Sequence, residues 1–249
     1  NLIAYSYGMN FLKEGDEIIV NISEHHSNML PWRQVAEKTG AIVKYYECEE
    51  NGSVDVDKIE AMMNERTRII AIAQVSNVFG YCQDIKEIAS RAHKYGAYIV
   101  CDGAQSVPHM PVDVQDLDVD FLVFSGHKMY APMGIGVMYG KREIMEKMPP
   151  FLYGGEMVEY VTRDGATYAE LPHKFEAGTV NDGGAVGLHA AIDYMNLIGW
   201  ETLMGRELHL TEIAMGEMAK IPHVHIIGSD KPEEHCGIIT FKIDGVHPH

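Results

Sequence analysis

The sequence predicts an α/β fold with a mostly parallel sheet and helices on both of its faces. Between residues 16 and 140, short apolar segments alternate with amphipathic helical segments. The apolar segments are nearly continuous runs of Val, Ile, Leu and Ala, which is typical of parallel strands that are buried on both faces. Gly40 and Gly96 follow two of the helical segments, and glycine commonly ends a helix.

Each expected element is marked by a change of pattern along the chain. The expected strands are residues 16–22, 41–47, 68–75, 97–102, 120–125 and 135–140, and the expected helices are residues 28–39, 55–66, 84–96, 184–198 and 200–219. In the helix over 84–96, apolar residues recur at the spacing of one helical face, which we expect to pack on the sheet. Residues 149–184 are rich in glycine and show no clear period. A structureless stretch of that length is usually functional.

Composition and charge exclude several classes of protein. A chain of 249 residues with 46% hydrophobic residues is long enough for a substantial core. Its formal net charge of −16 argues against binding to nucleic acid, which requires clustered Lys and Arg. No apolar run is long enough to span a membrane, no signal peptide is visible, and the four cysteines form no CxxC pair. We therefore expect a protein of the reducing cytoplasm that does not associate with membranes.

Polar and titratable side chains follow four of the expected strands. They are Glu24, His25, His26, Ser27 and Asn28 after the first strand, Ser76 and Asn77 after 68–75, Asp102, Gly103, Ala104 and Gln105 after 97–101, and Ser125, Gly126, His127 and Lys128 after 120–124. In an open α/β sheet, ligands bind outside the carboxyl ends of the strands. We therefore expect these four groups to converge on one ligand site.

Taken singly, these residues have ordinary structural explanations. Asp102 could cap the next helix, Asn77 could turn the chain, and His25 and His26 could start a helix. A single lysine such as Lys128 is usually a surface residue. The alternatives remain open for each residue, but the set as a whole has a more specific chemical interpretation.

Together, the residues after the strands supply a ring-stacking group, a carboxylate, an amide, a hydroxyl and an amine, the set that pyridoxal phosphate requires. In this interpretation Asp102 pairs with the pyridine nitrogen and Lys128 forms a Schiff base. Ser125 and His127 are placed to hold phosphate oxygens. We expect no metal site, because no HxH or HExxH pattern occurs with a matching carboxylate among the 13 histidines.

Five segments resemble, in this order, the class V aminotransferase family of fold-type I pyridoxal-phosphate enzymes. They are SEHHSNMLPW, VSNVFG, CDGAQS, FSGHKMYAPMGIG and FEAGT. The resemblance is strongest to SufS-type cysteine desulfurases, a group that includes selenocysteine lyases, and it covers essentially the whole chain. It implies a seven-stranded type of sheet in a large cofactor-binding domain over residues 1–198, with its N-terminal part missing. Residues 199–249 would begin a smaller, truncated α+β domain at the C-terminal end.

The resemblance also implies roles around the cofactor ring. Lys128 would form the internal Schiff base, and His25 would stack on the ring and relay protons. Asp102 would bind the pyridine nitrogen. Asn77 and Gln105 would lie near the phenolic oxygen, with Asn77 also close to the substrate. The catalytic residues would therefore be Lys128 and His25.

Further residues would hold the phosphate. The resemblance places Ser125 and His127 on the phosphate oxygens, and Thr179 in the FEAGT segment on the phosphate of a neighbouring subunit. This implies a homodimer with shared active sites. Two departures from the family concern the same region. Ala131 stands where the family usually has glycine, and the segment before Asn1, which in the family supplies a phosphate-binding threonine, is missing.

The reaction that the resemblance implies is desulfuration of L-cysteine to L-alanine, with the sulfur passed as an enzyme persulfide to an acceptor protein for iron–sulfur cluster assembly. The alternatives are a selenocysteine lyase acting on L-selenocysteine, another lyase or transaminase on the same scaffold, and a non-catalytic scaffold protein. The family's nucleophilic cysteine and substrate-binding arginine lie in a C-terminal part that is absent from this sequence. We do not expect any cysteine present in this sequence to take over that role; these are Cys48, Cys82, Cys101 and Cys236.

Overall fold

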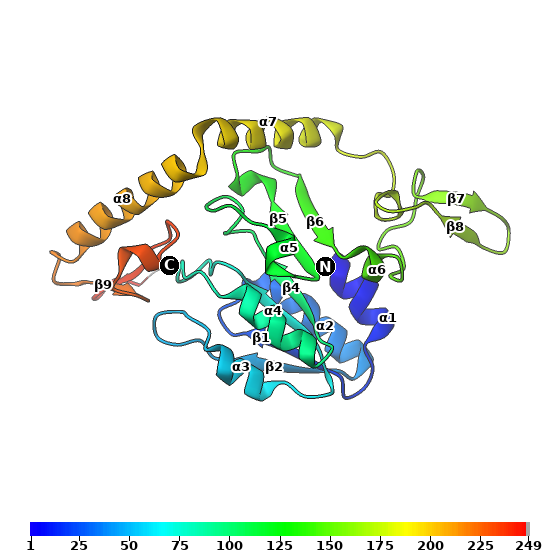
Figure 1. Ribbon diagram of the computed structural model, residues 1–249, viewed down its shortest axis with the longest axis horizontal. Helices are drawn as coiled ribbons and strands as arrows, with labels where there is room; N and C mark the ends of the chain where they lie inside the picture. The colour runs from blue at the N-terminus through cyan, green and yellow to red at the C-terminus, as the bar shows by residue number, and fades with distance from the viewer. Residues whose placement is uncertain (248–249) are drawn as a thin grey trace.

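The computed structural model describes residues 1–247 and is built around one sheet (Figure 1). Its strand order is β2-β1-β3-β4-β5-β6, and all neighbours are parallel except β6, which is antiparallel to β5. The strands are β1 (Glu17–Asn21), β2 (Ile42–Tyr46), β3 (Thr67–Ala73), β4 (Tyr98–Asp102), β5 (Phe121–Ser125) and β6 (Gly136–Gly140). The predicted α/β fold with a mostly parallel sheet is confirmed. This sheet has six strands among the described residues, where the resemblance implied a seven-stranded type.

Helices cover both faces of this sheet. Helices α3 (Val56–Met62) and α4 (Ile85–Lys94) pack on one face, while α1 (Met9–Phe11), α2 (Leu30–Thr39) and α6 (Arg142–Met145) pack on the other. Along β3, Ile70 and Ile72 belong to the first core and Ile69 and Ala71 to the second. Both faces of the strand are apolar because both are covered, which explains its continuous apolar run.

The predicted face of α4 is the buried one. Ile85, Ile88, Ala89 and Ala92 are all buried against the sheet. Asp84 caps the start of the helix by accepting a hydrogen bond from the backbone N–H of Glu87. Position and amphipathic spacing therefore agree between sequence and structure.

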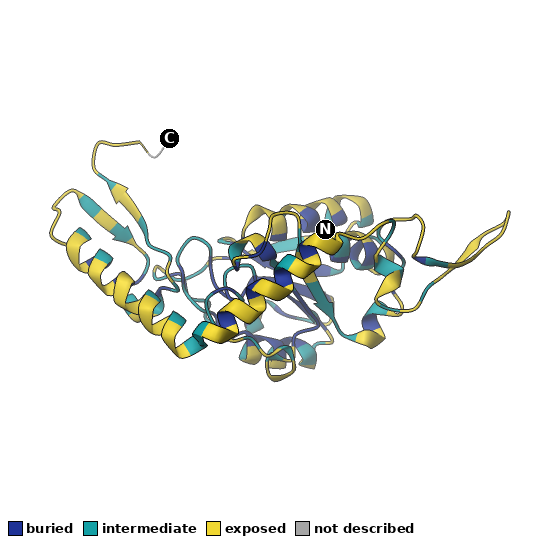
Figure 2. Cartoon of the chain, turned by 90° about the horizontal axis from the view of Figure 1, so that it is seen from above, coloured by how far each residue is buried: buried dark blue, intermediate teal, exposed yellow. Residues whose placement is uncertain are grey.

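Two long helices follow the sheet, α7 (Asp182–Ile198) and α8 (Trp200–Met218), with Gly199 between them at a φ of 85°. Helix α7 runs along one edge of the sheet, and α8 leads to a small hairpin of β9 (Val224–Ile227) and β10 (Thr240–Ile243) (Figure 1). Both helices expose much of their surface (Figure 2). No helix within residues 1–247 is both long and apolar enough to cross a membrane.

The glycine-rich stretch over 149–184 is more regular than its sequence indicates. It contains an antiparallel hairpin of β7 (Val158–Val161) and β8 (Ala166–Tyr168), which projects from the rest of the chain (Figure 1). The strands were missed because they are short and almost wholly exposed, so no buried face imposes a period of two. The remaining short elements are η1 (Ala4–Gly8), η2 (His26–Asn28), α5 (Val114–Leu117), η3 (Gly126–Lys128), η4 (His173–Phe175) and η5 (Pro232–Glu234).

A buried carboxylate anchors the amino end of the sheet. Glu17 opens β1 with its side chain 2% exposed. Its oxygens lie 2.6 Å from the Lys44 ammonium, 2.7 Å from the Asn64 amide nitrogen and 3.3 Å from the Arg66 guanidinium. Burial opposes ionisation, but the hydrogen bonds from Lys44 and Asn64 and the nearby positive charges outweigh it, so the pKa of Glu17 is lowered.

We predict that Lys44→Met destabilises the fold by about 1–3 kcal/mol at neutral pH, because Glu17 keeps its charge but loses its shortest partner. A depressed folded pKa gives stability that is present above the unfolded pKa and is lost as the pH falls through the folded pKa. The difference from wild type should therefore shrink in acid. Urea unfolding at several pH values measures it, with Lys38→Met as the control, because Lys38 is exposed and makes no ion pair with a described residue.

Candidate active site

The carboxyl ends of β3, β4 and β5 open onto a cavity of about 360 Å³. Seven of the eight residues that the sequence predicts for the site line this cavity: His25, Asn77, Asp102, Gln105, Ser125, His127 and Lys128. They come from four separate stretches of the chain, as the convergence at one sheet edge predicts. Thr179 does not line the cavity; it is exposed in the segment between η4 and α7.

His25 is held by the turn that follows β1. It precedes η2, and its ring Nδ1 accepts a hydrogen bond from the backbone N–H of Ser27 at 3.2 Å. Because Nδ1 is the acceptor in this bond, the neutral ring carries its proton on Nε2. The loop thus fixes both the ring and its tautomer.

Asp102 is the last residue of β4, and the chain turns sharply after it. The backbone N–H of Gly103 bonds to the carbonyl oxygen of Val123 at 2.8 Å, which keeps the turn against β5. The Asp102 Oδ1 accepts a hydrogen bond from the backbone N–H of Ala104 at 2.8 Å. No hydrogen bond from residues 1–247 reaches its Oδ2, which leaves one carboxylate oxygen available to a ligand in the cavity.

Lys128 belongs to η3, the tight turn that follows β5. Gly126 shapes this turn: its N–H bonds to the carbonyl oxygen of Ile135 at 2.9 Å, and its carbonyl accepts from the N–H of Ala131 at 3.1 Å. The Lys128 side chain is half-buried and makes no hydrogen bond or ion pair with any described residue. A half-buried amine without a partner is available for covalent chemistry with a ligand.

Ala131, which stands where the family usually has glycine, fits the structure because its side chain is packed. Its side chain is 9% exposed and belongs to a small core with Met129 and the α7 residues Leu188 and Ala191. The backbone at residue 131 is not left-handed, so no glycine is required there. The alanine therefore helps to seat α7 against the turn that carries Lys128.

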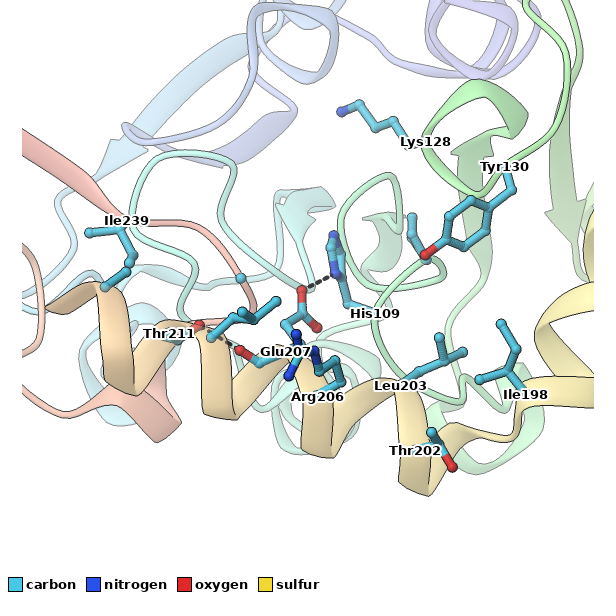
Figure 3. A pocket seen from close by; sticks show the side chains of 14 residues that line it. His109, Lys128, Tyr130, Ile198, Thr202, Leu203, Arg206, Glu207, Thr211 and Ile239 are labelled. Carbon is cyan, nitrogen blue, oxygen red and sulfur yellow. Dashed lines mark hydrogen bonds and ion pairs between the residues drawn. The ribbon is translucent and has the colours of Figure 1, made fainter. Parts of the chain in front are cut away.

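A second cavity, of about 570 Å³, meets the first at Lys128 (Figure 3). It lies between α8 and the segment after Gln105, and its lining includes Tyr130, Leu203 and Arg206. His109 Nδ1 and Glu207 Oε1 lie 2.5 Å apart and join this segment to α8 (Figure 3). Sequence reasoning missed this pair, because nothing local relates two residues so far apart in the chain.

The cysteines lie outside both cavities. None of the four is among the described residues that line them. Cys101 is fully buried beside Asp102, and burial, with a smaller contribution from the Asp102 charge, raises the pKa of its thiol. Cys101 therefore packs in the core between the sheet and the helices on one of its faces.

Fold and site together define an α/β protein with a ligand cavity at the carboxyl edge of its sheet, lined by a carboxylate, two imidazoles and an amine that pairs with no described residue. The chain belongs to the class-V aminotransferase family, whose family model matches residues 1–249.

Three similar proteins illustrate this membership. A probable cysteine desulfurase of Halalkalibacterium halodurans is 46% identical over all of this chain and 61% of the relative. A cysteine desulfurase of Pectobacterium atrosepticum is 44% identical over the same shares. The crystal structure of the Escherichia coli cysteine desulfurase CsdA has a TM-score of 0.93 and 40% identity over 99% of this chain and 61% of that one. The chain thus spans about three fifths of the length of these relatives.

We predict that Gly126→Ala destabilises the protein by roughly 1–3 kcal/mol through overpacking. A Cβ at this position would lie 2.8 Å from Ile135 Cγ2 and 3.1 Å from the Ala131 Cβ, so the turn that carries Lys128 must shift. Chemical unfolding measures the change. Gly183→Ala in α7 is the matched control, because its Cβ meets nothing within 4 Å, and it should be neutral or slightly stabilising. Equal stability of both variants would contradict the packing account.

Proposed function

We propose that the protein to which this chain belongs is a pyridoxal-phosphate-dependent cysteine desulfurase that converts L-cysteine to L-alanine. The observation that carries this proposal is the meeting of Lys128 and Asp102 in one cavity, each with a group that no described residue occupies. The sequence identity to cysteine desulfurases supports the choice of substrate.

The residues present fit the cofactor. Its aldehyde needs an amine, its pyridine nitrogen a carboxylate, its phenolic oxygen an amide donor and its phosphate hydroxyl and imidazole donors. The cavity supplies each of these with Lys128, Asp102, Gln105, Ser125 and His127. When it is bound, pyridoxal phosphate withdraws electrons from the substrate bonds that are broken.

In this proposal each residue of the cavity has a separate role in binding the cofactor or moving protons. Lys128 would hold the cofactor covalently through its amine and would move protons at the substrate Cα when that amine is free. Asp102 keeps the pyridine nitrogen protonated. His25, held through Nδ1 by Ser27, stacks on the ring and relays protons from Nε2. Asn77 lies near the substrate and the phenolic oxygen.

The sulfur-transfer step requires a thiolate that neither cavity contains among residues 1–247. A cysteine thiolate attacks the substrate sulfur, which forms an S–S bond and breaks the substrate Cβ–S bond, so that the persulfide stays on the enzyme and the electron pair leaves with the alanine carbon. We propose that this cysteine, and the arginine that binds the substrate carboxylate, correspond to the part of the relatives that this sequence does not match. An acceptor protein for iron–sulfur cluster assembly would take the sulfur.

Assembly forms part of the same proposal. We propose a homodimer in which the exposed Thr179 reaches the phosphate in the neighbouring subunit. Large apolar side chains exposed on α7, such as Val186, Tyr194 and Leu197, support burial of this helix in an assembly. We further propose that residues 1–198 form a large cofactor-binding unit and residues 199–249 begin a small one, joined where Gly199 separates α7 from α8.

We predict that Lys128→Ala abolishes the visible absorption band of covalently attached cofactor, because it removes the only amine among the described residues that line the cavity. The far-UV circular dichroism should not change, since Lys128 makes no hydrogen bond or ion pair with a described residue. Lys174→Ala, which alters a lysine outside the cavity, is the control and should keep the band. A full band in Lys128→Ala would contradict the assignment of Lys128 as the residue that forms the Schiff base.

We predict equal amounts of sulfide and alanine when the full-length protein is incubated with pyridoxal phosphate, L-cysteine and a reductant. Both products are quantified in the same reaction, with Lys128→Ala as the blank. Absence of both products from protein that shows the cofactor band would keep the cofactor site and reject cysteine as the substrate.

A further inference from the structure

Glu24 is a buried acid next to the proposed cofactor site, and it has no role in the proposed reaction. It lies in the turn after β1, immediately before His25, and its side chain is only 6% exposed. The sequence pattern groups it with the polar residues after the first strand but assigns it no role. Burial of an ionised carboxylate is unfavourable unless a positive group compensates for it.

The partners of Glu24 are both uncharged. Its Oε1 accepts a hydrogen bond from the backbone N–H of Ala73 at 2.9 Å, and its Oε2 accepts one from the Asn28 amide at 2.7 Å. The Asn28 oxygen in turn faces the indole N–H of Trp32 at 3.4 Å. No lysine, arginine or histidine within residues 1–247 forms an ion pair with Glu24.

The charged group that acts on Glu24 is Asp102. The Ala73 residue that binds Glu24 is paired in register with Asp102 on the neighbouring strand β4, so the two acids lie at the same edge of the sheet. The thiol of Cys101, also on β4, is kept neutral by burial. From η2 and β3, the groups that face Glu24 are the Asn28 amide and the Ala73 backbone, which are neutral.

Burial outweighs these hydrogen bonds in setting the pKa of Glu24. Burial raises the pKa of Glu24 to about 8; the hydrogen bonds from Ala73 and Asn28 oppose this rise, and the charge of Asp102 adds to it. Asp102 is better placed to carry the charge, since it lines an open cavity and accepts a hydrogen bond from Ala104.

We propose that Glu24 is a positioning residue that holds a proton behind Asp102, so that this edge of the sheet carries one negative charge, located on Asp102. A second charge at Glu24 would repel the Asp102 carboxylate. In its neutral form, Glu24 keeps Asp102 ionised for a protonated ring nitrogen. The link to the ring nitrogen rests on the proposed function, whereas the proton on Glu24 is a property of the chain alone.

The first test is a pH titration of wild-type protein without cofactor, labelled with [5-¹³C]glutamate and followed by NMR. One glutamate carboxyl signal should titrate with a midpoint near pH 8 and be missing from Glu24→Gln. In Asp102→Asn the midpoint should move to lower pH, because the repelling charge is removed. No midpoint above pH 6 in the wild type, or the same midpoint in Asp102→Asn, would overturn the proposal.

The second test compares unfolding of wild type and Glu24→Gln as a function of pH. A folded pKa raised above the unfolded one gives stability that is complete below the unfolded pKa and is lost as the pH rises through the folded pKa. The unfolding constant of the wild type, divided by that of Glu24→Gln, should therefore rise by about a hundredfold or more between about pH 4 and about pH 9. The wild type thus becomes less stable relative to the variant at high pH. Glu17→Gln is the matched control and should show the opposite sign, because the pKa of Glu17 is lowered. The same sign in both variants would contradict the proposal.

Addition of pyridoxal phosphate separates this proposal from the proposed function. If the cofactor binds, its positive ring nitrogen should move the Glu24 midpoint to lower pH in step with the rise of the visible band. A band with an unmoved Glu24 midpoint would refute the role toward Asp102 while leaving the cofactor site intact. A midpoint near pH 8 without any band would support the proton on Glu24 and reject pyridoxal phosphate as the ligand.

Discussion

The register of neighbouring parallel strands is the constraint on which the site depends. Ala73, Asp102 and Val123 are aligned in register across β3, β4 and β5. Strands β3 and β4 therefore end at the same level and β5 ends two residues beyond them, and polar side chains that follow all three strands line one cavity.

The two ends of the sheet differ in whether their acids form ion pairs. At the amino end, Glu17 is compensated by Lys44 and Arg66, and Asp120 by Lys141 and His93. At the carboxyl end, neither Glu24 nor Asp102 forms an ion pair with a described residue. The buried acids of the amino end are therefore paired within the chain, whereas Asp102 at the carboxyl end has an oxygen to which no described residue donates a hydrogen bond. This asymmetry connects the packing of the sheet with the chemistry proposed for the cavity.

Much of the fold could be predicted from the sequence, because strands buried on both faces and a strongly amphipathic helix such as α4 leave clear patterns. The convergence of His25, Asn77, Asp102 and Lys128 was predictable for the same reason, since each follows a strand. The exposed β7–β8 hairpin left no pattern, because no buried face constrained it. The His109–Glu207 pair depends on how α8 lies against a distant segment. The state of Glu24 depends on burial and on the absence of a cation, neither of which composition or spacing reveals.

The measurement that tests the central claim most directly is chemical location of the cofactor on the chain. The full-length protein is incubated with pyridoxal phosphate, reduced with borohydride, digested and mapped by mass spectrometry. The account predicts that the pyridoxyl group is attached to Lys128 and that Asp102→Asn weakens this labelling. Attachment chiefly to another lysine, or labelling that is unaffected by Asp102→Asn, would contradict the assignment of the cavity at the carboxyl edge of the sheet as the cofactor site.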